Sequence, residues 1–141
     1  MVDDHSRLAY AEVLEGLTAD CAVAFLRRAG AWFAERGVEI KAVMSDNGSC
    51  YVSHAFRAAL RELGLRHPRI KPYRPRTNGK AERFIQTLLN EWAYARLYGS
   101  TTERRRALPL FLDRYNFTRP HGALGKRPPA TRLNNLAGNY T

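Results

Sequence analysis

The chain has 141 residues, 45% hydrophobic and 11% aromatic, which is enough to bury one ordinary core. Its formal net charge is +10, because 23 lysines and arginines outnumber 13 acidic residues, and this excess favours a polyanionic partner such as nucleic acid. There is no run of 18 apolar residues, no basic-then-apolar leader and no disulfide framework, since only Cys21 and Cys50 are present. We therefore expect a cytoplasmic protein with reduced thiols and no membrane partner.

The first half of the chain predicts strands that alternate with helices. In chain order, they are a strand at Leu8–Leu14, a helix from Thr18 to about Arg36, a strand at Ile40–Ser45, a helix from Ser53 to Leu63 and a short strand from Leu65 to about Ile70. Thr18 and Ser53 can cap the two helices, because their side-chain oxygens can accept hydrogen bonds from the first free backbone N–H groups. Gly37 and Gly64 follow, and glycine commonly ends helices.

The second half predicts two more helices. The first has an apolar stripe at helical spacing that is typical of a helix packed on a core, formed by Ala81, Phe84, Ile85, Leu88, Leu89 and Trp92. Another helix is predicted from Thr101 or Thr102, and Pro109 is expected to kink or restart it. We divide the chain into a domain at residues 1–117 and a surface tail at 118–141 with little regular structure, because the tail is rich in Pro, Gly and Asn.

Two carboxylates are candidates for chemistry. Asp46 follows a predicted buried strand and precedes an Asn-Gly turn, at the edge where α/β sheets place their reactive groups. Glu82 lies in the first turn of a predicted helix, on the face opposite the apolar stripe. The alternative for Glu82 is an ordinary solvated polar face. The spacing between the two carboxylates is weak evidence, because Asp3 and Glu39 have the same separation.

Basic residues cluster within the 18 residues from Arg66 to Arg83. They are Arg66, Arg69, Lys71, Arg74, Arg76, Lys80 and Arg83, interleaved with Tyr73 and turn-forming residues. Such a cluster attracts a polyanion by releasing condensed counterions, so we expect binding that weakens steeply as salt rises. The alternative is a generically basic surface. Membrane binding is less favoured, because no basic amphipathic helix is paired with a wide apolar face.

Three groups of residues form recognisable sequence motifs. They are Ser45-Asp46-Asn47-Gly48, then Tyr73-Arg74-Pro75-Arg76-Thr77-Asn78-Gly79-Lys80-Ala81-Glu82-Arg83, then Tyr115-Asn116 with Arg119-Pro120-His121 and Ala123-Leu124. From Asp3 to about Leu133 the chain resembles the integrase core of DDE transposases of bacterial insertion sequences, relatives of retroviral integrases. The resemblance implies an α/β, ribonuclease H-like mixed sheet flanked by helices.

The resemblance also implies DNA nicking and strand transfer assisted by two divalent metal ions, Mg²⁺ or Mn²⁺. Asp46 and Glu82 match the second and third catalytic carboxylates, which act as metal ligands. The chemistry agrees, because phosphodiester transfer needs negative charge to be offset by two ions about 4 Å apart, and Mg²⁺ favours carboxylate oxygens.

DNA is the partner that this resemblance implies, both as transposon ends and as target. The candidate DNA contacts are Arg74, Arg76, Asn78, Lys80, Arg83 and Gln86. A homo-oligomer is expected for the intact enzyme, because enzymes of this family generally work as multimers on paired DNA ends.

The family places its first catalytic aspartate on an opening strand of the sheet. This sequence starts at Met1, so we expect the sheet to lack that strand and most of the second, as in a truncated reading frame or an incomplete gene model. Asp3 and Asp4 fall at the following turn and are not assigned the catalytic role. We expect the chain alone to be poorly folded or inactive. The missing strand is central in the sheet, and without it the neighbouring strands lack partners for their backbone hydrogen bonds.

Two functional hypotheses follow. The chain is the C-terminal portion of a two-metal transposase catalytic domain, or it is a non-catalytic remnant that binds DNA through its basic residues. A protein-interaction scaffold is a third and weaker alternative.

Overall fold

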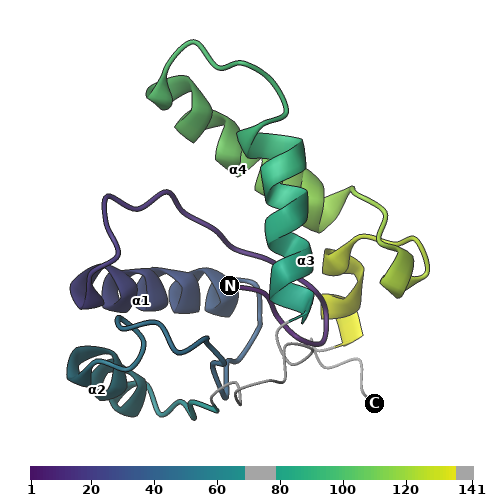
Figure 1. The fold of residues 1–141 in the computed structure, drawn as a ribbon. Helices are drawn as coiled ribbons and strands as arrows, with labels where there is room; N and C mark the ends of the chain where they lie inside the picture. The colour runs from purple at the N-terminus through teal and green to yellow at the C-terminus, as the bar shows by residue number, and fades with distance from the viewer. Residues whose placement is uncertain (69–78, 136–141) are drawn as a thin grey trace. The chain divides into compact units, whose positions relative to one another are not determined.

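The computed structural model describes residues 1–68 and 79–135 (Figure 1). Its elements in chain order are α1 (Ala19–Glu35), α2 (His54–Glu62), α3 (Gly79–Leu88), the π-helical turn η2 (Leu89–Ala93), α4 (Thr101–Phe117) and the 3-10 helices η3 (Gly122–Leu124) and η4 (Pro129–Asn135). The chain divides into two compact units. One unit is formed by Met1–Glu12 with Lys80–Thr141, and the other by Val13–Gly79.

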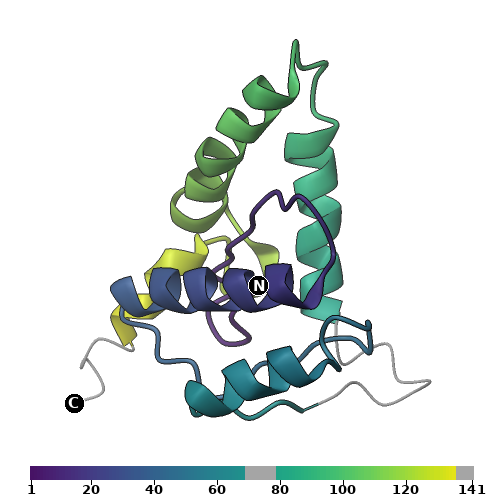
Figure 2. The ribbon, with the colours of Figure 1, turned by 90° about the vertical axis from the view of Figure 1, so that its left-hand side faces the viewer.

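The unit Val13–Gly79 is built on α1 and α2, which lie against each other (Figure 2). Both predicted N-caps are confirmed, because the side-chain oxygens of Thr18 and Ser53 each accept a hydrogen bond from the backbone N–H three residues later, over 3.2 Å. Gly37 and Gly64 follow the helices with φ of 77° and 68°, a conformation that glycine adopts without strain. The buried side chains of the two helices are Ala22, Leu26, Ala29, Phe33, Phe56, Ala59 and Leu60.

The other unit has its core among α3, η2 and α4, which follow one another along the chain (Figure 1). The buried side chains of this cluster are Ala9, Phe84, Trp92, Ala93, Leu108, Phe111, Leu112 and Tyr115. Trp92 donates its indole N–H to the carbonyl of Arg104 over 2.9 Å, and the Tyr98 hydroxyl donates to the carbonyl of Trp92 over 2.7 Å. These two bonds connect η2, the loop after it and α4.

The predicted apolar stripe of α3 is only partly correct. Phe84 and Trp92 are buried, whereas Ile85 is 48% exposed and Leu89 is 39% exposed. The helix changes to a π-helical turn at Leu89, and a π turn holds more residues than an α turn, so the side chains that follow are rotated relative to the α-helical pattern. Ile85 lies before this turn, so the turn does not account for its exposure, and the stripe facing the core is narrower than the sequence spacing predicts.

The helix α4 begins at Thr101, as predicted, and Ser100 caps it by accepting a hydrogen bond from the N–H of Glu103 over 3.1 Å. The helix is continuous from Thr101 to Phe117, so it does not restart at Pro109; the alternative expectation, a kink at Pro109, stays a prediction. Pro109 is exposed, so its ring can be accommodated on the solvent side.

The predicted strands are not found in the described residues. Isolated bridges join Val2 to Ala9 and Ala42 to Arg66, the second in parallel orientation. A strand needs several consecutive pairings with a neighbour, and the segments 8–14 and 40–45 each make one bridge with the residues described. The mixed sheet expected from the sequence is therefore unconfirmed.

The segment after α4 is more regular than predicted. It forms η3 and η4, and Leu124 and Pro129 are buried. The expectation of a surface tail with little regular structure is wrong for these residues. The segment is rich in Pro and Gly, but its apolar side chains still pack inward. The proposed domain boundary at residue 118 stays a prediction.

Candidate functional site

Asp46 lies in an exposed turn of the unit Val13–Gly79. Its Oδ1 accepts a hydrogen bond from the backbone N–H of Gly48 over 2.8 Å, so the aspartate closes its own turn and its carboxylate has a fixed direction. A side chain at Gly48 would bring Cβ to 3.0 Å from that oxygen. Just before the turn, Ser45 Oγ lies 2.7 Å from His67 Nε2, which connects the turn to the segment that follows α2.

Glu82 lies in the first turn of α3 and is exposed. Its carboxylate makes no hydrogen bond or ion pair with the residues that the structure describes. Two residues later, Phe84 is buried, and its ring packs edge to face on Tyr115 of α4 with the centroids 5.0 Å apart. The helix that carries Glu82 is therefore anchored to the core while the carboxylate itself faces solvent.

The two predicted catalytic carboxylates belong to different units, and the structure describes the surroundings of each separately. Both offer exposed carboxylate oxygens, the hard ligands that Mg²⁺ and Mn²⁺ accept, so their chemistry fits the metal that the sequence implies. Within residues 1–68 and 79–135, no group of three or more His, Cys, Asp or Glu side chains gathers. A shared metal site at Asp46 and Glu82 stays a prediction.

Three of the predicted DNA contacts, Arg74, Arg76 and Asn78, lie outside the described residues. Lys80 is described, and its Nζ donates to Asp4 Oδ1 over 2.5 Å and to the Asp4 carbonyl over 2.9 Å. This hydrogen bond lowers the pKa of Asp4. The charge of Lys80 is therefore already partly balanced by a residue that the sequence did not connect with it.

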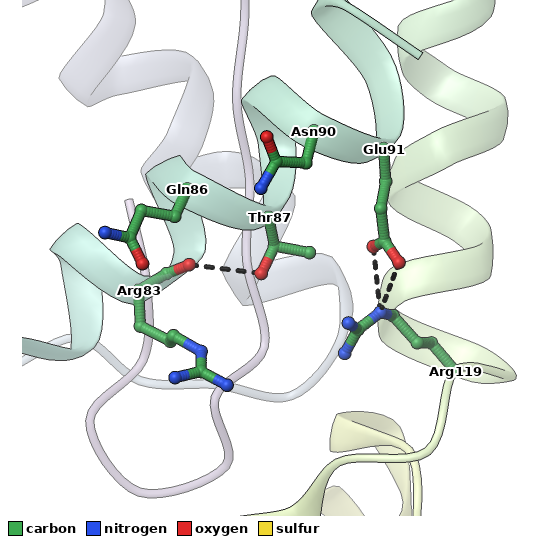
Figure 3. Close-up of a pocket in the computed structure, with 6 residues that line it drawn as sticks. All are labelled: Arg83, Gln86, Thr87, Asn90, Glu91 and Arg119. Atoms are coloured by element: carbon green, nitrogen blue, oxygen red, sulfur yellow. Dashed lines mark hydrogen bonds and ion pairs between the residues drawn. The ribbon is translucent and has the colours of Figure 1, made fainter.

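Arg83 and Gln86 line one pocket of about 310 Å³ on α3 and η2 (Figure 3). The other lining residues are Thr87, Asn90, Glu91 and Arg119. Arg119 donates from Nε to both oxygens of Glu91, over 3.2 and 2.9 Å. The sequence motif contains Arg119, but no sequence signal connects it with a glutamate 28 residues earlier.

The other residues of the C-terminal motif also have structural roles. The ring of His121 packs edge to face on Tyr115 at 4.6 Å between centroids, and its Nε2 lies 3.1 Å from the Tyr115 carbonyl. Burial lowers the pKa of His121 and raises the pKa of Tyr115. Asn116 is fully buried and hydrogen-bonds to the backbone of Ala9 through both ends of its side-chain amide.

Two family models, each described as an integrase core domain, match residues 1–75 and 63–129. The putative transposase InsD for insertion element IS2E of Escherichia coli is 32% identical over 96 residues, which are 68% of this chain and 44% of that protein. An uncharacterized Caenorhabditis elegans protein is 38% identical over 88 residues, 62% of this chain and 7% of its own length. The chain thus spans less than half the length of these curated relatives.

Two solved structures share the fold. A chain of the simian T-cell lymphotropic virus intasome superposes with a TM-score of 0.76 at 24% identity, covering 94% of this chain and 45% of that one. The catalytic core domain of BIV integrase gives a TM-score of 0.74 at 24% identity, covering 99% of this chain and 87% of that one. The fold is therefore that of integrase catalytic cores. In the described part of the chain, no helix is long and apolar enough to span a membrane.

Proposed function

The chain belongs to the integrase core domain family, and from this membership we propose that it acts in DNA transposition, as part of a catalytic core that nicks DNA and joins a transposon end to target DNA. The match of the family model to residues 1–75 is the observation that carries the proposal. The curated relative named as a transposase supports the same process. The net charge of +10 supports a DNA partner.

Asp46 and Glu82 are the proposed metal ligands. When bound, two Mg²⁺ or Mn²⁺ ions supply the positive charge that offsets the phosphoryl oxygens and lowers the pKa of an attacking water or 3′-hydroxyl. The hydrogen bond from Gly48 directs the Asp46 carboxylate, and the contact of Phe84 with Tyr115 holds the helix that carries Glu82. Positioned carboxylates of this kind lose little entropy when the reacting groups meet.

DNA is the proposed substrate and partner. Arg74, Arg76, Asn78, Lys80, Arg83 and Gln86 are the proposed contacts. Of these, Arg83 and Gln86 are supported by their place in one polar pocket. We also propose a ribonuclease H-like sheet, a homo-oligomer on paired DNA ends and a cytoplasmic location.

A non-catalytic DNA-binding remnant is the second candidate. The observation that favours it is the excess of basic residues, which suffices for DNA binding without any chemistry. The two candidates differ in whether the carboxylates of Asp46 and Glu82 are needed for strand transfer.

Strand transfer from a labelled transposon-end duplex to a supercoiled plasmid tests the proposal, with Mg²⁺ or Mn²⁺. The chain is assayed alone and joined to an N-terminal segment of an integrase core that carries a further strand with an aspartate. Asp46→Asn and Glu82→Gln are compared with Glu39→Gln and Asp113→Asn, which alter exposed carboxylates elsewhere on the same two units. DNA retention on a filter is measured for every variant.

We expect Asp46→Asn and Glu82→Gln to lower strand transfer about a thousandfold, equivalent to roughly 4 kcal/mol of transition-state stabilisation, and to leave DNA retention within about twofold. The control variants are expected to keep full activity. Unchanged activity in Asp46→Asn or Glu82→Gln would show that the catalytic assignment is wrong. If no form of the chain transfers strands although all forms retain DNA, the binding-only candidate is correct.

A further inference from the structure

The pocket on α3 and η2 has an unusual electrostatic composition. All six of its lining side chains are polar, and they include the two cations Arg83 and Arg119 but only the one anion Glu91. Figure 3 shows both guanidinium groups directed into the same open space beside the helix. Two like charges that share a pocket repel each other, so this site favours an additional anion.

Arg119 has hydrogen-bonding capacity that Glu91 does not use. Both bonds to the carboxylate of Glu91 come from Nε. A guanidinium group has five N–H donors, and the four on the two terminal nitrogens of Arg119 make no hydrogen bond with the residues that the structure describes. Glu91 therefore fixes the direction of the guanidinium group and leaves its outer edge for a ligand.

The guanidinium group of Arg83 is also available to a ligand. Its backbone carbonyl accepts a hydrogen bond from Thr87 Oγ1 over 3.1 Å, while its exposed guanidinium group makes no hydrogen bond or ion pair with the described residues. The amide groups of Gln86 and Asn90 add neutral donors to the lining.

We propose that this pocket binds one backbone phosphate of DNA between the guanidinium groups of Arg83 and Arg119, with Glu91 as the positioning residue for Arg119. A guanidinium group matches two oxygens of a phosphate through parallel N–H bonds, and two such groups can hold both non-bridging oxygens of a phosphodiester. The inference rests on the proposed function, because the proposed substrate is the source of the phosphodiester.

The test measures the affinity of the chain for a fluorescent random-sequence duplex as a function of salt. The variants are Arg83→Gln, Arg119→Gln and Glu91→Gln. Arg127→Gln is the matched control, because Arg127 is an exposed arginine of the same unit that does not line the pocket. The melting temperature of each variant is recorded, so that a loss of affinity can be separated from a loss of folding.

Arg83→Gln and Arg119→Gln are each expected to weaken binding about tenfold at low salt and to reduce the slope of log K against log salt by about one. Arg127→Gln is expected to change neither quantity. Glu91→Gln is expected to bind DNA at least as tightly as the parent chain, because it removes a negative charge beside the phosphate while its amide oxygen can still accept from Arg119. These opposite effects distinguish a phosphate site from an ion pair that only stabilises the fold.

Equal losses of DNA affinity in Glu91→Gln and Arg119→Gln, accompanied by equal losses of melting temperature, would overturn the proposal, because they would show that the pair is purely structural. Inorganic phosphate is titrated separately, observed through the Nε–H NMR signals of Arg83 and Arg119. If phosphate shifts these signals and the DNA affinity is indifferent to both arginines, the pocket binds free phosphate and the DNA assignment is wrong. If the parent chain binds no duplex at all, the proposed function itself fails, which is a different result from binding that is merely insensitive to the two arginines.

Discussion

Asn116, on the last turn of α4, forms two hydrogen bonds with the backbone of Ala9, a residue 107 positions earlier in the chain. Its Oδ1 accepts from the Ala9 N–H over 2.9 Å, and its Nδ2 donates to the Ala9 carbonyl over 2.8 Å. Both residues are fully buried. The side-chain amide thus supplies the donor and acceptor that a neighbouring strand supplies in a sheet, and it fixes the N-terminal segment to α4.

Asn116→Ala is expected to lower the free energy of unfolding by about 2–4 kcal/mol, because two buried backbone groups of Ala9 lose their partners. Urea unfolding followed by circular dichroism measures this as a lower midpoint with an unchanged slope. Asp113→Ala, on an exposed position of the same helix, serves as the control and is expected to change stability by less than about 0.5 kcal/mol. Equal midpoints for the two variants would mean that water replaces the amide.

The helices could be predicted from sequence because their signals are local. Thr18 and Ser53 bond to N–H groups three residues away, so cap and helix can be recognised within one short window. The Asn116 contact is different in kind, since its partner is distant in sequence and is a backbone group that any residue provides. The periodicity of apolar residues predicts which side chains are buried. It does not predict which backbone groups a buried side-chain amide will hydrogen-bond.

The candidate site likewise has features that could be predicted from local sequence and features that could not. Asp46 and Glu82 could be proposed because each is embedded in a recognisable local motif, and the turn at Gly48 closes on Asp46 as the Asn-Gly signal predicts. The pairing of Arg119 with Glu91 could not be predicted, because it depends on the π-helical turn that rotates Glu91 relative to α3 and on the path of the chain after α4. The exposure of Ile85 was missed for a related reason, since helical spacing alone does not give the width of the buried face.

Gly48→Ala is expected to lower metal-dependent strand transfer about tenfold or more while leaving stability nearly unchanged. The new Cβ would lie 3.0 Å from Asp46 Oδ1, closer than an ordinary contact, so the carboxylate must move, and small displacements of catalytic groups are costly. The strand-transfer assay and urea unfolding are measured together. A Gly16→Ala variant is the control, because its Cβ meets nothing within 4 Å. Full activity in Gly48→Ala would argue against a catalytic role for the Asp46 turn.

Pro109→Ala is expected to stabilise the chain by about 1–3 kcal/mol. Proline inside a helix lacks an N–H donor and its ring crowds the preceding turn, and α4 continues through Pro109 at an exposed position. Thermal unfolding of the variant measures the gain. Leu110→Ala, at a neighbouring position that is 72% exposed, is expected to have little effect. A lower melting temperature for Pro109→Ala would indicate that the proline ring makes a packing contact that outweighs the missing hydrogen bond.

His121→Phe is expected to reduce the loss of stability on acidification. Burial lowers the pKa of His121 below its ordinary value of 6.5, opposed by a hydrogen bond from the ring to the Tyr115 backbone; the nearby charges of Arg119 and Arg7 lower it further and Glu91 raises it. Between the folded pKa and 6.5 the unfolded chain binds more protons, so stability falls as the pH falls through this range.

Phenylalanine cannot be protonated, and it keeps the aromatic contact that His121 makes with Tyr115. Urea midpoints at about pH 7.5 and about pH 5.5 give the loss for each protein, and the remaining histidines are common to both and cancel in the comparison. The parent chain is expected to lose more stability than the variant over this interval. Identical losses would show that His121 is protonated as easily in the folded chain as in the unfolded one, which the burial of its ring against Tyr115 argues against.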